Sequence, residues 1–347
     1  MKKLLFASTA LIASAGIAAA EVSVSGDGRM GVVYDSMGLE MPGGALQFAG
    51  TGQLIDGPPP ATGTSGGNPN WGFTNRIRIS FSASGETDTG LTFGGSIRAD
   101  NAGPGAGGTA GNVYVDGAFG KLSMGDVGGG DDAVLGGLHG VGLTGLGSNS
   151  LNFASSGDLG PSSVLGTGET AANGRVLYEY DMDGFSFAAS HSQTGNTRSI
   201  GIGAGYSMAG FDVAVGFGHA RFSAPGLVNT RTRDISASAG YSFGDFEVSA
   251  VAQQKQTTAG GVQTDRTRSL GLSGAANFDM VEVTAFAMQM RSTAFNQSGH
   301  SFGIGAAYDL GGGASLEGGI ARTRGFSVPG VAQPTRTSAD FGVSLSF

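Results

Sequence analysis

The chain of 347 residues has no cysteine, and only 13% of its residues are charged. The lack of cysteine excludes disulfide bonds, thiolate zinc sites, iron–sulfur clusters and a cysteine nucleophile. Positive charge is also scarce, because 19 Lys and Arg residues stand against 27 Asp and Glu residues, which leaves a net charge of −8. An acidic balance gives no general attraction for phosphate backbones, so we expect no nucleic-acid partner.

Long hydrophobic runs are absent beyond the first twenty residues, so the rest of the chain predicts no transmembrane helix. Residues 1–20 begin with Lys2 and Lys3, continue with an apolar stretch over 4–17 and end in three alanines. This order is typical of a bacterial secretory signal peptide. We therefore expect cleavage before Glu21, with residues 21–347 forming the exported mature domain.

Glycine is abundant, at 66 residues, and this argues against a helical protein. Each glycine in a helix interior costs about 1 kcal/mol relative to alanine. The glycines do not recur at every third position, which excludes collagen, and 39% of the residues are apolar, which argues against a disordered chain.

Apolar and polar residues alternate along most of the mature chain, as in strands with one apolar and one polar face. Near the C-terminus the apolar set is Ala339, Phe341, Val343, Leu345 and Phe347. Several hairpins of one design follow each other in the second half of the chain. Each has an aromatic residue shortly before its turn: Tyr206, Tyr241, Phe278 and Tyr308.

Short turns alternate with longer connections along the chain. The seven short turns are predicted near 86–90, 117–120, 181–184, 209–210, 244–245, 279–280 and 311–313. The eight longer connections are predicted near 36–70, 101–111, 128–174, 194–198, 222–232, 256–266, 291–299 and 323–336. Together they join sixteen strands, with all the long loops on one side.

The polar half of the alternation indicates where the apolar half must face. It consists of Ser, Gly, Thr, Asp, Arg and Gln, which is too polar for a protein core, so the apolar half faces lipid. Only a closed barrel satisfies every strand hydrogen bond in lipid. We therefore predict an all-β fold, a transmembrane antiparallel β-barrel of 16 strands with a polar, water-filled interior. Between 281 and 290 the alternation does not decide which side chains face lipid. Either Phe286 and Met288 or Val283, Ala285 and Ala287 could do so.

Several segments resemble one known family. They are the mature start EVSVSGDGRMGVVYD, the segment FTNRIRISFSASGETDTGLTFGGSIRAD, the turn GAFGKLSMGD and the C-terminal Phe347. These segments are similar to the general diffusion porins of the Rhodobacter (alphaproteobacterial) type, which belong to the Gram-negative outer-membrane porins. The resemblance is strongest over 21–35, 71–127 and 300–347. It implies a sixteen-stranded antiparallel barrel, a homotrimer and a third loop that folds inward to narrow the pore.

The alternation of side chains along each strand, called parity below, places four arginines on the inner face of three neighbouring strands. They are Arg29, Arg76, Arg78 and Arg98. Arginine stays charged at all physiological pH values, and its guanidinium groups can stack in an ordered row. By the resemblance, this wall carries the basic side of the pore constriction.

The acidic side is expected on the third long connection, about 128–174. Its acids are Asp131, Asp132, Asp158 and Glu169, with Asp126 at its root. Opposed charges would create a transverse field that orients polar solutes. A Ca²⁺ ion held by Asp126, Asp131 and Asp132 is a further hypothesis, but a solvated acidic loop explains the same residues, and no cofactor is predicted.

The sequence thus predicts an outer-membrane porin that passes ions and small hydrophilic solutes passively. No Ser–His–Asp constellation or metal-ligand spacing is present, so no enzyme is predicted. The alternative is a substrate-specific outer-membrane channel of the same barrel fold. We expect the protein in the outer membrane of a Gram-negative cell, as a homotrimer in contact with lipid and lipopolysaccharide.

Overall fold

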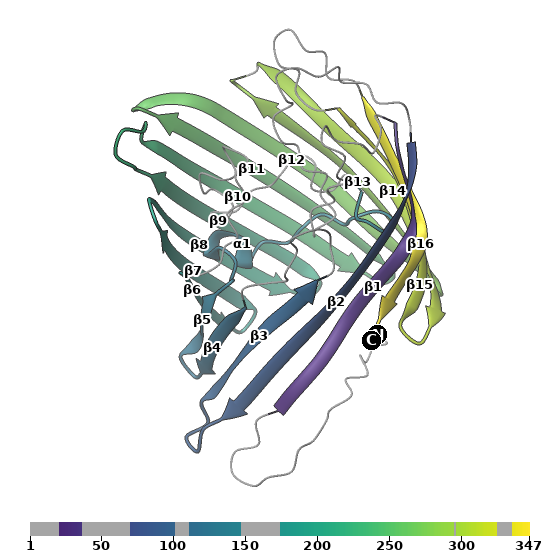
Figure 1. Ribbon diagram of the computed structural model, residues 1–347, viewed down its shortest axis with the longest axis horizontal. Coiled ribbons are helices and arrows are strands. Elements are labelled where there is room, and N and C mark those ends of the chain that lie inside the picture. The colour runs from purple at the N-terminus through teal and green to yellow at the C-terminus, as the bar shows by residue number, and fades with distance from the viewer. Residues whose placement is uncertain (1–20, 37–69, 101–110, 147–173, 295, 325–334) are drawn as a thin grey trace.

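The computed structural model describes residues 21–36, 70–100, 111–146, 174–294, 296–324 and 335–347 (Figure 1). The predicted signal peptide, residues 1–20, lies outside the described residues. Within them, sixteen strands form one closed antiparallel barrel in which every strand pairs with its neighbours in the chain. The strands are β1 (Glu21–Asp35), β2 (Asn70–Glu86), β3 (Thr92–Asp100), β4 (Asn112–Gly117), β5 (Gly120–Gly125), β6 (Arg175–Met182), β7 (Phe185–Thr194), β8 (Thr197–Met208), β9 (Phe211–Phe222), β10 (Thr230–Phe243), β11 (Phe246–Ala259), β12 (Val262–Phe278), β13 (Val281–Ser292), β14 (Gln297–Gly311), β15 (Ala314–Arg324) and β16 (Arg336–Ser346). The predicted fold class is therefore confirmed.

The barrel closes where β1 pairs with β16. The C-terminal Phe347 takes part in this seam, because its amide donates to the Gly26 carbonyl at 3.0 Å and its carbonyl accepts from the Gly26 amide at 2.6 Å. At the other end of the seam, Arg336 forms an ion pair with the buried Asp35 at 2.5 Å. The seam thus has polar anchors at both ends, and it closes the sheet on itself.

The connections fall at or beside the positions predicted from the sequence. Six of the seven predicted short turns are two-residue hairpin turns, and the one between β2 and β3 spans residues 87–91. Two predicted longer connections, near 194–198 and 256–266, are instead two-residue turns at 195–196 and 260–261, because strand pairing continues to Thr194 and Thr197 and to Ala259 and Val262. Asp183 and Gly184, between β6 and β7, have φ angles of 49° and 84°. Positive φ at both positions is the geometry of a type I′ turn, for which an Asp-Gly pair is strongly favoured.

Side-chain direction follows the predicted alternation. On β8, Ile200 and Ile202 point outward and are 46% and 50% exposed, whereas Ser199 points inward and is buried. Similar outward apolar residues recur on strands all around the barrel, whereas soluble monomers rarely expose large continuous apolar patches. They form the lipid-facing surface.

Aromatic rings collect at the short-turn rim. Phe211 stacks on Tyr241 at 3.9 Å between ring centroids, and Tyr241, Phe243 and Phe246 continue the row at 5.3 and 5.5 Å. Amphipathic and aromatic side chains favour the boundary between lipid and water, where such girdles mark transmembrane barrels.

The structure settles the open parity on β13. Phe286 and Met288 face the interior and are each 4% exposed, while Ala285 and Ala287 face outward. The reason is a tertiary contact, because both inward residues pack with Val141 in a small internal cluster. Among the described residues, the helix α1 (Gly130–Ala133) is short, and no helix is long and apolar enough to cross a membrane.

A charge placed on the outer face tests the membrane orientation of the wall. Leu272 lies near the middle of β12 and points outward, whereas Ser249 on the neighbouring β11 points inward. We expect Leu272→Lys to lower the free energy of unfolding in lipid vesicles by about 2–4 kcal/mol, the cost of a cation at the bilayer midplane. Denaturant titration followed by the fluorescence of Trp71, the single tryptophan, measures this change. Ser249→Lys is the matched control, and equal losses for both variants would contradict the assigned orientation.

Candidate functional site: the barrel interior

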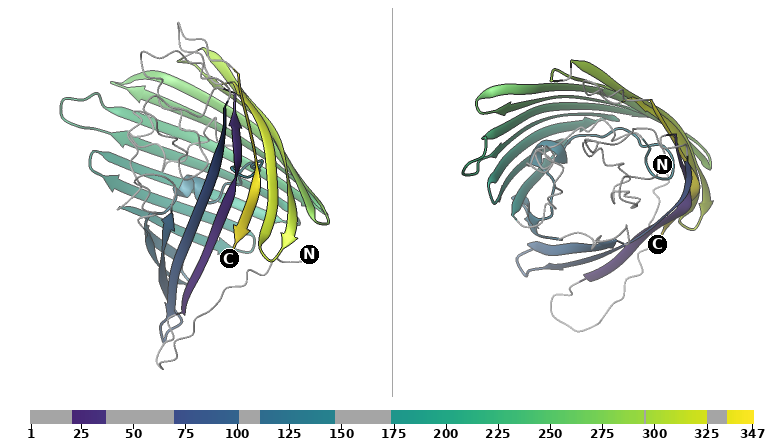
Figure 2. Two further views of the ribbon diagram at one scale, coloured as in Figure 1. Left: turned by 45° about the vertical axis from the view of Figure 1, so that its right-hand side comes forward. Right: turned by 45° about the horizontal axis from the view of Figure 1, so that its top comes forward.

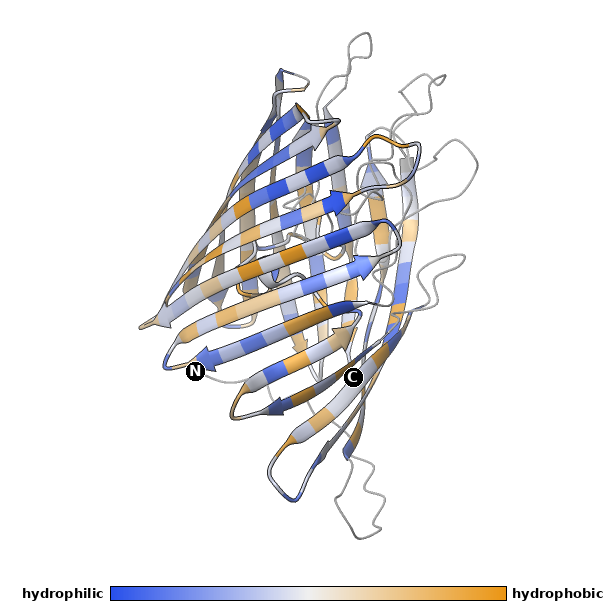
Figure 3. Cartoon of the chain, turned by 90° about the vertical axis from the view of Figure 1, so that its left-hand side faces the viewer, coloured by the Kyte–Doolittle hydropathy of each residue, from blue (hydrophilic) through white to orange (hydrophobic). Residues whose placement is uncertain are grey.

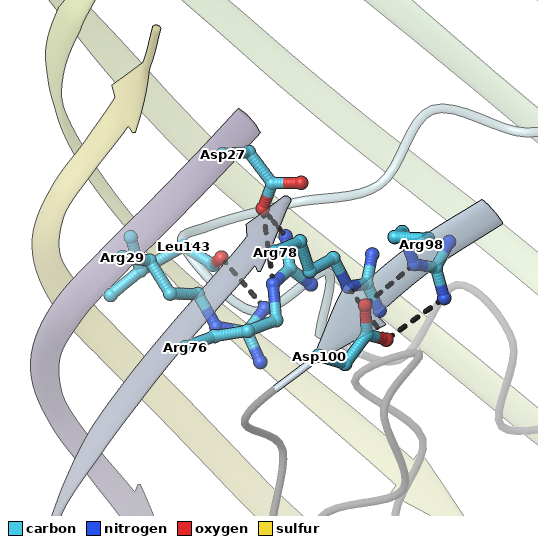
Figure 4. Close-up of polar contacts among 7 residues, drawn as sticks. All are labelled: Asp27, Arg29, Arg76, Arg78, Arg98, Asp100 and Leu143. Carbon is cyan, nitrogen blue, oxygen red and sulfur yellow. Dashed lines mark hydrogen bonds and ion pairs between the residues drawn. The ribbon is translucent and has the colours of Figure 1, made fainter. Parts of the chain in front are cut away.

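Four arginines line one wall of the interior (Figure 4). Arg29 comes from β1, Arg76 and Arg78 from β2, and Arg98 from β3, and all four point inward as parity predicted. Arg29 and Arg76 stand directly opposite each other on adjacent strands. The residues that the sequence prediction grouped together are therefore neighbours in space.

Two carboxylates hold three of these four guanidinium groups in place. Asp27 accepts two hydrogen bonds from Arg76, at 2.5 Å from Nη2 and 3.1 Å from Nε. Asp100 accepts a bidentate pair from Arg98, at 2.7 and 2.9 Å, and also forms an ion pair with Arg78 at 3.4 Å. Bidentate contacts fix the plane of a guanidinium group as well as its position.

Neither carboxylate belongs to the set predicted from the sequence. Each shares the inward parity of its arginine partner, since Asp27 precedes Arg29 by two residues and Asp100 follows Arg98 by two. That parity is the signal that could have identified them. Four arginines against two aspartates leave this wall with a surplus of positive charge.

The described part of the third long connection, residues 126–146, runs along the inside of the barrel wall, and its first part is held by β6 to β9 (Figure 2). Arg175 on β6 donates to the Val127 carbonyl at 2.6 Å. The amide of Gly130 in α1 then donates to Ser190 Oγ on β7 at 2.8 Å. Glycines make this approach feasible, because a Cβ atom at Gly216 on β9 would overlap the backbone of Asp131.

The middle of the connection is held by serines of the wall. The Gly136 amide donates to Ser238 Oγ on β10 at 3.0 Å, and the His139 amide donates to Ser273 Oγ on β12 at 2.9 Å. The His139 ring also lies 3.4 Å from a carboxylate oxygen of Glu247 on β11. Backbone groups that would otherwise lack a protein partner are thus satisfied by inward hydroxyls.

The described part of the connection ends against β13 to β16 and β1. Asp340 on β16 accepts hydrogen bonds from the amides of Leu143 and Thr144, at 3.0 and 2.6 Å, and from the Thr144 hydroxyl at 2.5 Å. Gly319 on β15 allows the contact, because a Cβ atom there would lie 2.8 Å from Gly142 Cα. The segment also reaches the arginine wall, where Arg29 donates to the Leu143 carbonyl at 3.4 Å.

The predicted acidic residues do not share one environment. Asp132 is exposed on the connection, and Asp126 is half-buried at its root. Asp131 differs from the prediction, because it is only 1% exposed and lies against the wall beside Asp234. The glycines of β9 let the backbone of α1 press into the wall, and this turns the Asp131 carboxyl away from the channel. Asp158 and Glu169 lie outside the described residues.

The structure gives no support for a metal centre in this region. Within the part of the chain that the structure describes, no group of three His, Asp or Glu side chains is placed to hold a metal ion. Asp126 and Asp132 are therefore not joined to Asp131 in a ligand cluster.

Taken together, the fold and interior define a class. A closed antiparallel barrel with a lipid-facing exterior, a polar interior and a long connection laid along its inner wall is a channel-forming barrel of the outer membrane. The family model described as Gram-negative porin matches residues 7–325, and the chain therefore belongs to the Gram-negative porin family. This membership confirms the predicted family, and it agrees with the prediction of a non-enzymatic channel.

Individual relatives support the same assignment. The porin of Rhodobacter capsulatus is 31% identical over 209 residues, which are 57% of this chain and 56% of that relative, so the match spans about half the relative's length. A porin structure refined at 1.8 Å resolution is 26% identical with a TM-score of 0.66, covering 94% of this chain and 100% of that chain. The trimer form of OmpT, an outer membrane protein of Vibrio cholerae, shares the fold at 14% identity, with a TM-score of 0.67 over 94% of this chain and 99% of that chain.

The anchor at Asp340 predicts how the interior responds to mutation. We expect Asp340→Ala to increase both the mean single-channel conductance and the current noise, because three hydrogen bonds to the segment 141–146 are lost. Planar-bilayer recording measures both quantities. Asp309→Ala, at the short-turn rim, is the matched control, since its carboxylate contacts only the Gly311 amide among the described hydrogen bonds. Unchanged conductance and noise would show that the apolar contacts of Val141 and Leu146 hold the segment without Asp340.

Proposed function

We propose that the protein is a passive, water-filled channel through which ions and small hydrophilic solutes cross the outer membrane. The observation that carries this proposal is the arginine wall, which faces a long connection anchored around the opposite side of the same interior. Such an arrangement narrows a barrel and leaves a polar passage beside the arginines. Sorting then depends on pore width and charge, and no chemical step or cofactor is needed.

The constriction has a basic and an acidic side in this proposal. Arg29, Arg76, Arg78 and Arg98 form the basic side, and Asp132 and Asp126 contribute to the acidic side. Because opposed charges create a field across the passage, a polar solute is stabilised when its dipole aligns with that field. An apolar solute has no such favourable electrostatic energy. Asp131 serves instead to seat α1 against the wall, as its burial supports.

Asp27 and Asp100 have a supporting role in this scheme. A row of like charges tends to spread, and a shared carboxylate limits the spreading by holding two guanidinium groups at set positions. Asp100, whose side chain is only 7% exposed, does this for Arg78 and Arg98. The basic side is therefore a rigid surface and not a set of freely moving side chains.

We further propose that the chain is exported by a cleaved signal peptide at residues 1–20 and assembles as a homotrimer. The proposal on export rests on the basic, apolar and small-residue order of that segment. The proposal on assembly rests on family membership, and on OmpT of Vibrio cholerae, whose structure of the same fold is a trimer form. Conductance steps that occur in groups of three would agree with it.

The arginine wall predicts a change in ion selectivity. For the mature protein in a planar bilayer, we expect large ohmic conductance steps and weak selectivity. We expect the double variant Arg76→Gln/Arg98→Gln to raise the cation-to-anion permeability ratio by at least about twofold, because two fixed positive charges leave the passage. The reversal potential under a salt gradient measures this ratio.

The control removes equal charge from the outside of the barrel. Arg233→Gln/Arg268→Gln changes two outward-facing arginines and should leave the reversal potential unchanged. Equal shifts in both double variants would contradict the location of the constriction. Conductance that saturates with one solute would instead favour a substrate-specific channel, and no conductance from folded protein would exclude a pore.

A further inference from the structure

Carboxylate side chains gather inside the barrel at the short-turn rim, where the seven predicted short turns lie. We define the acidic mouth as five of them: Glu86 on β2, Asp181 on β6, Asp212 on β9, Glu247 on β11 and Glu282 on β13. Each is the second, the next-to-last or the last residue of its strand, and the five strands are spread around the barrel. Four of the five side chains are exposed, and Glu282 is half-buried.

The alternation along the strands points all five carboxylates inward. Glu282 shares the parity of Phe286, which packs in the internal cluster. Glu247 lies 3.4 Å from the ring of His139 on the inner connection. The other three share the parity of inward residues on their own strands, which are Arg78, Arg175 and Ala214. Figure 3 shows this alternation of hydrophilic and hydrophobic residues along the strands of one wall. The mouth therefore faces the passage and not the lipid.

Positive charge is scarce at this entrance. Among the described residues, Lys121 on β5 is the one Lys or Arg beside the short-turn rim. It stands opposite Asp116 on one side and Glu179 on the other, two further acids that already balance it. In the part of the chain that the structure describes, no member of the mouth forms an ion pair with Lys or Arg. The short turns add four more carboxylates: Asp88, Asp183, Asp245 and Asp279. This entrance therefore carries uncompensated negative charge.

Two members of the mouth border a cavity of about 290 Å³ between the wall and residues 133–137 of the inner connection. Asp212 and Glu247 line it together with inward serines. The Asp212 carboxylate extends over β10, where a Cβ atom at Gly240 would lie 4.0 Å from its Oδ2 atom. Because β9 and β11 are separated by one strand, they are about 10 Å apart, which is close to the Debye length at 0.1 M salt. The fields of the two carboxylates therefore overlap in a space that has room for hydrated cations.

The acidic mouth and the arginine wall lie at different depths in the passage. Glu86 and Arg78 share the inner face of β2 and are eight residues apart, or about 27 Å along the strand. At the usual strand tilt of about 35–45° this corresponds to about 20 Å along the barrel axis. Arg78 is at the middle of its strand, whereas Glu86 is at its end. The inward charge therefore changes sign along the axis, from negative at the short-turn entrance to positive near the middle.

We propose that the acidic mouth is a second selectivity element, which concentrates small cations at one entrance and, in series with the arginine wall, makes the channel conduct asymmetrically. A ring of carboxylates raises the local concentration of cations, and arginines do the same for anions. This inference rests on the channel of the proposed function, and it adds the residues that distinguish its two entrances.

The order of the two charges determines the direction of the asymmetry. When the chamber that faces the short turns is positive, cations enter through the acidic mouth while anions enter from the other side past the arginines. Both ions then accumulate between the two elements, and the current is high. The opposite polarity depletes both ions. The Debye length is about 30 Å at 10 mM salt and about 3 Å at 1 M, so the effect appears at low salt and the current is linear at high salt.

Current–voltage curves of single channels in KCl test the proposal. Thr89→Cys, in the turn between β2 and β3, gives this cysteine-free chain one thiol for biotin, and streptavidin added to one chamber then identifies the short-turn side. At 10 mM KCl we expect the current to be at least about 1.5-fold larger when that side is positive by 100 mV than when it is negative, and equal in both directions at 1 M. Glu86→Gln/Asp212→Asn/Glu247→Gln/Glu282→Gln should remove at least about half of the asymmetry at 10 mM.

The matched control keeps every charge, because Glu86→Asp/Asp212→Glu/Glu247→Asp/Glu282→Asp changes only side-chain length and should retain the asymmetry. A second measurement needs only the Thr89→Cys protein: the cation-to-anion permeability ratio should be higher when the dilute solution faces the short turns than when it faces the other side, since dilution there leaves the mouth unscreened. A linear current at 10 mM, the opposite polarity, or equal asymmetry in the neutral variant would overturn the proposal. A conducting but symmetric channel leaves the proposed function standing, whereas folded protein that does not conduct overturns both.

Discussion

The whole fold depends on one constraint: lipid offers no hydrogen-bond partners, so backbone amides and carbonyls must pair with each other. A strand in lipid must pair on both sides, so the sheet has to close, and here it closes where β1 meets β16. The reciprocal hydrogen bonds between Gly26 and Phe347 carry the ladder to the last residue of the chain. Closure in turn fixes an inside and an outside, and every charged side chain on a strand is assigned to one of them.

The interior is organised by the need to satisfy a second stretch of backbone, the connection that lies within the barrel. Its amides donate hydrogen bonds to wall side chains in succession around the barrel: Ser190, Ser238, Ser273 and Asp340. Wall glycines leave the space in which the backbone of α1 and of Gly142 can approach. The high glycine content thus has a role beyond tight turns, because it allows one layer of backbone to lie on another.

Charge is treated differently on the two faces. Inside, Asp27 and Asp100 hold three of the arginines in a row, which keeps positive charge at a set place in the passage. Outside, arginines stand opposite arginines without a carboxylate between them in the described regions. The inner arrangement suits a field that acts on passing solutes.

From the sequence alone, the two-residue period determined that the chain forms strands and which way Arg29, Arg76, Arg78 and Arg98 point, because the alternation of side chains in a strand is a local property. The series of turns and connections determined the number of strands. The partners of these residues depended on the tertiary structure. Register placed Asp100 between Arg78 and Arg98, and the path of the long connection turned Asp131 into the wall and Phe286 towards Val141. Such contacts join residues far apart in the chain, and no local pattern encodes the place where an irregular connection meets the sheet.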